Sequence, residues 1–528
     1  MLSSSEKIEK AFKINNLVIL QKSLKIRIMI ILLFCLFIVT INQTIVSIAG
    51  PSILAELGGF KYYSWIFSGT ALTAAICSPI TGKLYDLYGP KIIIIFFLFI
   101  FTFAILFCGL SNTMFSLIIF RILQGVGIGG VYGIIWIMTA SLWNPDERGK
   151  WVGIATASFT VGTMIGPVMG GFITQTIGWR WIFFLNLPLS MILITAILIV
   201  FPSQEKVISK KFDYKGTIIF IFFVSSFLIG ISNIVQDNSY RYINSIIIFS
   251  VSFCSLGLFI YIEKKEKENA LIDLSLFKYK FFIGGTLGSI FLVSAFVTWS
   301  VFLPLSLVTV YGYSLSQASI PLMTYAIGIA LGSSFFGFFI SHEKLQLPIA
   351  LIGFILTTIA FSISGYTYLD INFHLLLIIA FIIGFGFSGT ITAYIVPIQN
   401  KLPEKKIGVV TTWLQFSRIF GNSFGTAILG VILLLNMNTY NFEPPREYIY
   451  NPDNISSIEK IEEIREKYVN SGKIELFDKD LKSSKNNLNN GLRYVYFSSS
   501  IAGIIGIIIS IFIFPKPALL RILIRKKS

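Results

Sequence analysis

Two arginines lie inside long apolar stretches, and each has amide side chains at helical spacing. Gln124 follows Arg121 by three residues, whereas Gln415 and Asn422 stand three residues before and four residues after Arg418. Residues three or four apart share one face of a helix. An arginine within a bilayer helix costs roughly 2.5–3.5 kcal/mol even on the lenient insertion scale, so it should face a polar cavity or a partner. The pattern predicts a cavity for coupling ions or substrate; snorkelling of the arginines and polar bonding between helices are the alternatives.

The apolar stretches around these arginines have the length of membrane-spanning helices. Of the 528 residues, 55% are hydrophobic and 13% are charged, about half the charged share of a typical soluble domain. The hydrophobic residues fall into fourteen runs of about 18–25 residues, the length of helix that crosses ~30 Å of hydrocarbon. We therefore predict an all-α membrane protein with 14 transmembrane helices.

The placement of charge predicts the orientation of these helices. The net charge of +16 could indicate nucleic-acid binding, but most Lys and Arg residues lie in the tails and the even-numbered loops. The short odd-numbered loops hold only Lys61, Arg180 and Arg241, which is the positive-inside pattern. We predict a multi-pass protein of the plasma membrane with cytoplasmic tails at 1–27 and 515–528, no cleavable signal peptide and no nucleic-acid partner.

The chain contains an internal repeat. The glycine-rich segment 125–130 recurs as 384–389. Two related halves that rock against each other are one way in which transporters achieve alternating access. We predict two pseudo-symmetric six-helix bundles, over 28–201 and 281–514, with an inserted helix pair and its linkers over 202–280.

Two features lie at the outer ends of the apolar runs. The polar segment 436–493 is expected to be a solvated extracellular loop, with a binding domain as the alternative; apolar spacing predicts a short amphipathic helix over 458–468. The last membrane span is expected to begin at Val495. Trp179 and Trp181 are interpreted as anchors at the membrane interface.

A stripe of glycines marks the fifth apolar run. Gly162, Gly166 and Gly170 are four residues apart and therefore share one helix face, and Gly171 follows them. Small residues at this spacing let two helices approach closely in lipid. Pro167 removes a backbone donor and loosens that turn, which favours a moving element over the alternative of simple tight packing.

A short loop between the second and third runs places a carboxylate at the membrane rim. Gly82 and Gly89 permit a tight turn, and Asp86 between them can pair with a cation such as Arg148, while Lys91 follows the turn. We call these five the latch residues; an ordinary surface carboxylate is the alternative for Asp86.

Five segments together resemble those of a known family. Residues 82–91, 121–125 and 162–171 are similar to the signature loop, the fourth-helix motif and the antiporter motif of the major facilitator superfamily, and 42–46 and 178–188 resemble segments of its fourteen-helix drug:proton antiporters. The resemblance implies that the ion pair of Asp86 holds the outward-facing state closed on the cytoplasmic side and that Arg121 takes part in proton exchange.

The sequence departs from that family at two places. Pro90 stands where the family usually has Arg, and Asn42, followed by Gln43, stands where exporters of cationic drugs usually carry an acid. No Asp or Glu lies inside any of the fourteen runs. Two buried arginines without an acid predict a cavity suited to neutral, zwitterionic or anionic substrates.

These observations predict a secondary active transporter that exports small amphipathic molecules by alternating access, through proton-coupled antiport. An exporter of an endogenous lipid or metabolite, and a non-transporting sensor on the same fold, are the alternatives. No nucleophile, base and acid converge at membrane depth, so an enzyme is not expected. No nucleotide-binding loop occurs, and the Cys and His residues are scattered. We expect no metal and no cofactor; the expected partners are substrate, protons and lipid, and the expected state is a monomer.

Overall fold

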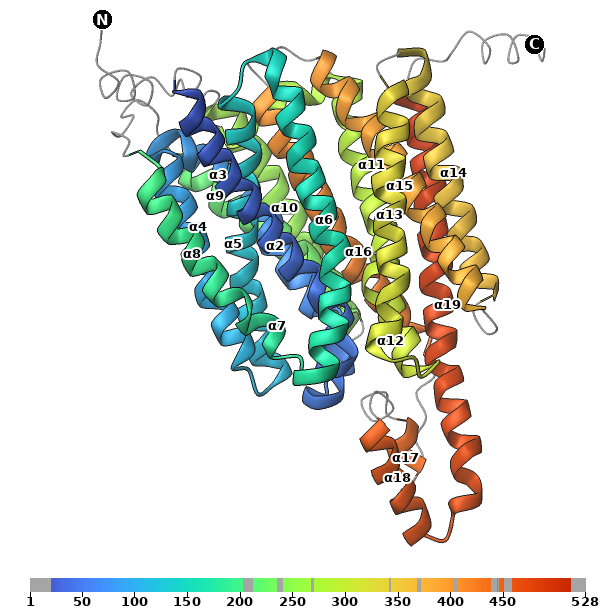
Figure 1. The fold of residues 1–528 in the computed structure, drawn as a ribbon. Coiled ribbons are helices and arrows are strands. Elements are labelled where there is room, and N and C mark those ends of the chain that lie inside the picture. Colours follow the sequence, from blue (N-terminus) through green and yellow to red (C-terminus); the bar gives the residue numbers. More distant parts are fainter. Residues whose placement is uncertain are drawn as a thin grey trace, which may run out of the picture.

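The computed structural model describes residues 20–202, 212–234, 241–266, 270–340, 343–367, 372–401, 407–437, 444, 446–450 and 458–513. These residues form long helices that run side by side as one bundle, with a smaller helical extension at one end (Figure 1). Thirteen helices in these ranges are long and apolar enough to cross a membrane. The helix of the remaining predicted run, α3 (Trp65–Tyr88), contains several Ser, Thr and Gly residues and packs inside the bundle. The predicted all-α membrane fold is confirmed.

The first half of the bundle holds seven helices, because the sixth span is broken into two pieces. They are α2 (Lys22–Leu57), α3, α4 (Pro90–Gly109), α5 (Met114–Ser141), α6 (Pro145–Ile177), α7 (Trp181–Phe184) and α8 (Asn186–Val200). A short 3-10 turn, Phe60–Tyr62, precedes α3. Helix α2 begins at Lys22, so it takes in the last residues of the tail predicted over 1–27.

The second half repeats this arrangement. Its helices are α11 (Lys280–Val297), α12 (Leu303–Thr309), α13 (Leu315–Phe339), α14 (Glu343–Thr367), α15 (Phe373–Lys401), α16 (Ile407–Leu435) and α19 (Ile474–Ile513). A π-helical turn, Thr298–Phe302, interrupts the first span between α11 and α12. Such turns inside a helix are rare and frequently occur at functional sites.

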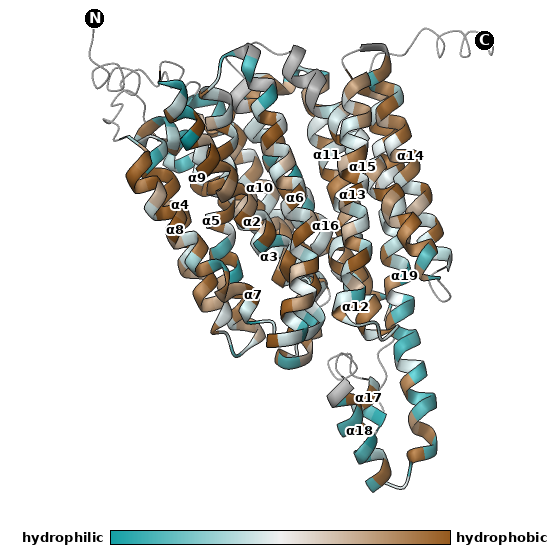
Figure 2. Cartoon of the chain, viewed as in Figure 1, coloured by the Kyte–Doolittle hydropathy of each residue, from teal (hydrophilic) through white to brown (hydrophobic). Residues whose placement is uncertain are grey.

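The same helix pairs pack together in both halves. Helix α2 contacts α6 as α11 contacts α16, and α3 contacts α5 as α13 contacts α15. The halves meet along two seams, α3 against α16 and α6 against α13. The predicted pseudo-symmetric bundles are therefore present. Much of the ribbon of these helices is brown in Figure 2, which marks the hydrophobic residues expected of membrane spans.

The inserted pair, α9 (Tyr214–Asn233) and α10 (Arg241–Glu266), lies beside the α3–α16 seam. The contact is aromatic: the ring of Phe220 lies 5.4 Å from that of Phe416, and Phe227 stacks on Phe424 at 6.1 Å. Aromatic contacts at these distances add to the stabilisation from burial alone. The pair is thus attached to the second half mainly through α16.

The segment predicted as a solvated loop is largely helical. It holds α17 (Arg446–Tyr450), α18 (Ile458–Asn470) and the part of α19 over 474–493, which projects well beyond the bundle (Figure 1). The buried Asp480 carboxylate accepts hydrogen bonds from Arg446 Nε at 2.9 Å, Arg446 Nη2 at 2.8 Å and the Tyr468 hydroxyl at 3.0 Å. Burial first, and then this carboxylate, raise the pKa of Tyr468. The short helix predicted over 458–468 is confirmed, and further helix covers 446–450 and 474–493, where none was predicted.

The helix that carries the last span begins well before the apolar run that was predicted from Val495, for a physical reason. The first turns of α19 are rich in charged residues, and they are held both by the bonds of Asp480 to α17 and α18 and by the packing of Phe477 on Tyr468. The helix therefore begins at Ile474 instead of Val495. The basic tail predicted over 515–528 lies outside the described residues.

Candidate functional site

A buried polar cluster joins three helices of the first half. Arg121 on α5 donates from Nε to the carbonyl oxygen of Ile66 on α3 at 3.2 Å, and from Nη1 to Gln124 Oε1. Gln124 Nε2 in turn donates to Asn42 Oδ1 on α2 at 2.5 Å. Arg121 is 1% exposed, and Gln124 and Asn42 are fully buried. The structure thus brings together three of the predicted site residues, and Arg121 does not snorkel.

The charge of this cluster is not compensated by an acid. Within the described residues no carboxylate forms an ion pair with Arg121, and Asn42 Nδ2 has no hydrogen-bond partner. A buried charge without a counter-ion is costly, and such groups are concentrated at functional sites. The cluster therefore has unused hydrogen-bonding capacity in a place where structural residues would normally be satisfied.

A tyrosine that sequence reasoning missed extends the polar face. The Tyr132 hydroxyl on α5 donates to Gln43 Oε1 at 3.2 Å and lies 3.1 Å from Thr40 Oγ1, both on α2. Tyr132 follows Arg121 by eleven residues, which is three helical turns along the same face. That spacing was visible in the sequence, but a tyrosine among glycines and aliphatic residues gave no separate signal.

The second arginine faces the first half. Arg418 on α16 donates from Nη2 to Gln415 Oε1, and its charge acts on Tyr132 across the boundary between the halves. Arg418 Nε is buried and has no hydrogen-bond partner in the part of the chain that the structure describes. Asn422 is half-buried one turn further along α16. Tyr132 is therefore one of the points at which polar groups of the two halves approach each other.

The glycine stripe of α6 packs directly on α2. A methyl group built on Gly166 would lie 2.0 Å from Thr44 Oγ1, and one on Gly170 would lie 2.8 Å from the carbonyl oxygen of Ile45. Gly162 meets Thr40 in the same way at 3.1 Å, while Gly171 faces α13, 2.8 Å from the carbonyl oxygen of Leu315. The stripe thus holds α6 close to α2, and its last glycine lies at the seam between the halves. Pro167 lies inside this helix.

The latch residues lie at the end of the bundle where Gly89 joins α3 to α4, which we call the Gly89 end. Gly89 has a φ of 77°, a left-handed conformation that favours glycine. Lys91 Nζ donates to the carbonyl oxygens of Leu198 at 2.8 Å and Phe201 at 2.7 Å, so it caps the end of α8. Gly82 and Asp86 are half-buried nearby. The side chain of Arg148 lies outside the described residues, so its pairing with Asp86 stays a prediction.

The two halves touch at the opposite end, which we call the α18 end. The Tyr63 hydroxyl donates to the carbonyl oxygen of Val301 at 3.2 Å, and Ser316 Oγ donates to Gln175 Oε1 at 2.7 Å. A turn deeper, Ser423 Oγ donates to the carbonyl oxygen of Ser68 at 2.7 Å. Both seams are therefore joined at the α18 end.

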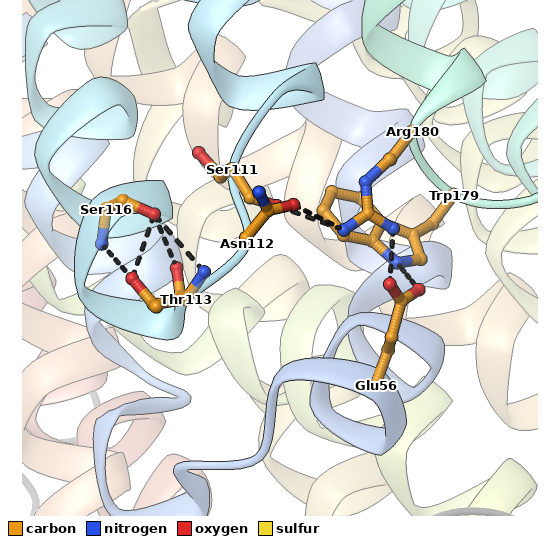
Figure 3. A network of polar contacts seen from close by, with 7 residues as sticks. All are labelled: Glu56, Ser111, Asn112, Thr113, Ser116, Trp179 and Arg180. Atoms are coloured by element: carbon orange, nitrogen blue, oxygen red, sulfur yellow. Dashed lines mark hydrogen bonds and ion pairs between the residues drawn. The ribbon is translucent and has the colours of Figure 1, made fainter.

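A second polar network stiffens the first half at the α18 end (Figure 3). Glu56 on α2 pairs with Arg180, accepts from Trp179 Nε1 at 2.6 Å, and thereby ties α2 to the turn before α7. Arg180 Nη2 also donates to the carbonyl oxygen of Ser111 at 3.1 Å. Trp179 is only 3% exposed, so its interpretation as an interface anchor was wrong, whereas Trp181 is exposed.

Comparison with known proteins identifies relatives of this arrangement. The family model described as Major Facilitator Superfamily matches residues 32–426. The chain is 29% identical to the multidrug transporter protein MdtP of Bacillus subtilis (strain 168) over 407 residues, covering 76% of this chain and 74% of that protein. It is 28% identical to the multidrug resistance protein 3 of the same organism over 404 residues, covering 76% and 78%.

Solved structures with the same fold include a bacterial homolog of the human lysosomal transporter Spinster in an inward-facing and occupied conformation. The TM-score is 0.60, with 14% sequence identity, over 93% of this chain and 97% of that one. The human organic anion transporter MFSD10 gives a TM-score of 0.56 and 13% identity, over 92% and 99%. At these identities the likeness shows the fold alone.

Proposed function

We propose that this chain, which belongs to the Major Facilitator Superfamily, is a secondary active exporter of small amphipathic molecules, of the multidrug efflux type, driven by proton antiport. It is a membrane-embedded transporter with a small-molecule substrate, and the two Bacillus subtilis relatives named for multidrug transport and resistance favour the efflux class. The observation that carries the proposal is the buried, uncompensated cluster of Arg121, Gln124 and Asn42.

The contacts between the halves support alternating access. They are bonded at the α18 end through Ser316 and Gln175 on one seam and through Ser423 and Ser68 on the other. A rocking transporter must break such contacts each time the site opens to that side. In the predicted orientation, with both termini cytoplasmic in the plasma membrane, the contacts close the external side, and the Asp86–Arg148 pair would close the other side after the halves rock.

The arginines also favour a substrate class. Arg121 and Arg418 supply positive charge and hydrogen-bond donors, and the fourteen apolar runs contain no acid. A site of this kind attracts anionic, zwitterionic or neutral groups and repels cations. A site that binds anionic, zwitterionic or neutral groups would also suit an exporter of an endogenous metabolite, which is the second candidate function. A relative that is 26% identical, described as a transporter of the acurin A biosynthesis cluster of Aspergillus aculeatus, favours this candidate.

The experiment is transport by purified protein in lipid vesicles under an imposed pH gradient, with ethidium and an anionic dye as probes. The gradient should drive movement of the anionic dye, and a protonophore should abolish it. Preference for ethidium would contradict the charge assignment. Movement that ignores the pH gradient would contradict proton antiport, and movement of neither probe nor of any metabolite would leave only the sensor alternative.

A further inference from the structure

Two acids are buried at the Gly89 end of the inserted helix pair. Asp213 immediately precedes α9 and is 7% exposed, and Glu263 lies in the last turn of α10 and is 2% exposed. Both lie at the very edge of their apolar runs. Buried carboxylates are rare unless they are paired or protonated.

Each carboxyl group uses only one of its oxygens. Asp213 Oδ1 accepts the backbone N–H of Gly216 at 2.8 Å and so caps α9. Glu263 Oε2 accepts the backbone N–H of Ile272 at 2.8 Å, which ties α10 to the segment before α11. The other oxygens, Asp213 Oδ2 and Glu263 Oε1, are buried and have no hydrogen-bond partner among the described residues.

The two unpartnered oxygens meet beside Gly216. A methyl group built on this glycine would lie 2.1 Å from Asp213 Oδ2 and 2.8 Å from Glu263 Oε1. Glycine is therefore what leaves room for the pair. Two buried carboxylates this close cannot both be ionised, because their charges repel and neither is solvated. One proton between them gives each free oxygen a partner, an O–H donor on one and a charged acceptor on the other.

Among the described residues, the surrounding charges do not supply a counter-ion, and Asp213 is the charged group whose electrostatic effect reaches Glu263. Of the lysines near the two acids in sequence, Lys215, Lys264 and Lys265 are exposed, whereas Lys210, Lys211 and Lys267 lie outside the described residues. The other charged residues on the packed elements are Glu266 on α10, Lys83 and Asp86 on α3, Arg418 on α16, and Asp273 and Lys278 before α11. Thr217 Oγ1, one turn into α9, is buried and likewise without a partner.

We propose that Asp213 and Glu263 form a proton-binding site that holds one shared proton at neutral pH. The site lies where the inserted pair joins the second half, since Glu263 bonds the segment that leads into α11. Loss of the proton leaves two buried charges and loosens α10 from Ile272. The inference concerns proton binding itself and does not depend on which substrate the protein carries.

The test uses the full-length protein in lipid nanodiscs. In Glu263→Gln the amide oxygen still accepts from Ile272 and the amide N–H donates to Asp213, so this variant mimics the protonated pair. The wild type should lose melting temperature as the pH rises from about 4.5, where an unfolded Glu loses its proton, to about 7, and should level off above that pH. Glu263→Gln should stay flat over this range and melt a few degrees higher, roughly 2 °C or more, at the alkaline end. Asp213→Asn should behave in the same way, and Glu266→Gln, on the same helix end, should follow the wild type.

A second readout identifies the proton directly. Infrared spectra at neutral pH should show the C=O band of a buried protonated carboxylic acid in the wild type and in Glu266→Gln, and this band should be absent from Glu263→Gln. The proposal is overturned if the band persists in Glu263→Gln, or if Glu263→Gln and Asp213→Asn both lower the melting temperature at every pH. It is also overturned if Na⁺ in place of choline stabilises the wild type but not Glu263→Gln, because that result identifies a metal-cation site.

Discussion

The buried Arg121 guanidinium donates to the Gln124 side chain and to one backbone carbonyl, and Gln124 donates in turn to Asn42. No acid balances this charge among the described residues. Hydrogen bonds in a buried network of this kind polarise one another, and a network that leaves some polar groups without partners costs folding free energy. Arg121 and Gln124 share a helix, so their contact follows from their spacing. Their link to Asn42 needs the packing of α2 on α5, which no spacing encodes.

Replacing Arg121 by Ala should reduce transport strongly. Hydrogen bonds to charged groups contribute about 1.5–3 kcal/mol, so if the cluster acts in the transport cycle the rate in vesicles should fall roughly 10- to 100-fold. The exposed Arg493→Ala is the matched control and should transport normally. Melting temperatures in detergent separate a transport defect from a folding defect; wild-type transport by a folded Arg121→Ala protein would remove this residue from the mechanism.

At the scale of elements, the α2–α6 pair is held by glycines that face threonines and backbone carbonyls. Gly166 lies against Thr44, and its counterpart in the second half, Gly425, lies against the backbone of Ser294 on α11. Close helix approach of this kind is how bilayer helices gain packing energy, since lipid itself offers no hydrophobic drive between helices.

Gly166→Ala should destabilise the protein, because the added methyl would lie 2.0 Å from Thr44 Oγ1. Overpacking typically costs about 1–3 kcal/mol of stability. Adding Thr44→Ala to Gly166→Ala removes the clashing hydroxyl and should restore much of the lost stability. Gly153→Ala on the same helix meets nothing within 4 Å and serves as the control. The wild type, Gly166→Ala, Thr44→Ala and the double variant form a double-mutant cycle, which is read from their melting temperatures. Purely additive effects would mean that the Gly166 and Thr44 positions do not contact each other.

Sequence patterns captured the elements that depend on local chemistry and missed those that depend on contacts between distant residues. Run length predicted the spans, and the repeat predicted the paired halves. Hydropathy could not extend α19 back to Ile474, since Asp480 is satisfied by Arg446 and Tyr468 from other helices. Asp213 and Glu263, at the ends of α9 and α10, lie outside every apolar run. They were not recognised as a pair because only the packing of the two helices brings them together.

At the scale of the whole molecule, two related bundles are joined at the α18 end by polar contacts that a rocking cycle must break and remake. The seam between α6 and α13 offers the most accessible of these contacts, since Gln175 and Ser316 are both exposed and their side chains lie within 2.7 Å. Joining these two positions covalently should hold the halves in the arrangement described here.

The most direct test of alternating access is therefore Gln175→Cys with Ser316→Cys, in a background in which Cys35, Cys77, Cys108 and Cys254 are replaced. Oxidation should stop transport in vesicles, and a reductant should restore it. A cysteine pair within one half, Thr113→Cys with Ser116→Cys, whose hydroxyl oxygens lie 3.0 Å apart, should leave transport unchanged under both conditions. Transport at the full rate while the disulfide between positions 175 and 316 is intact would contradict alternating access by rocking of the two halves.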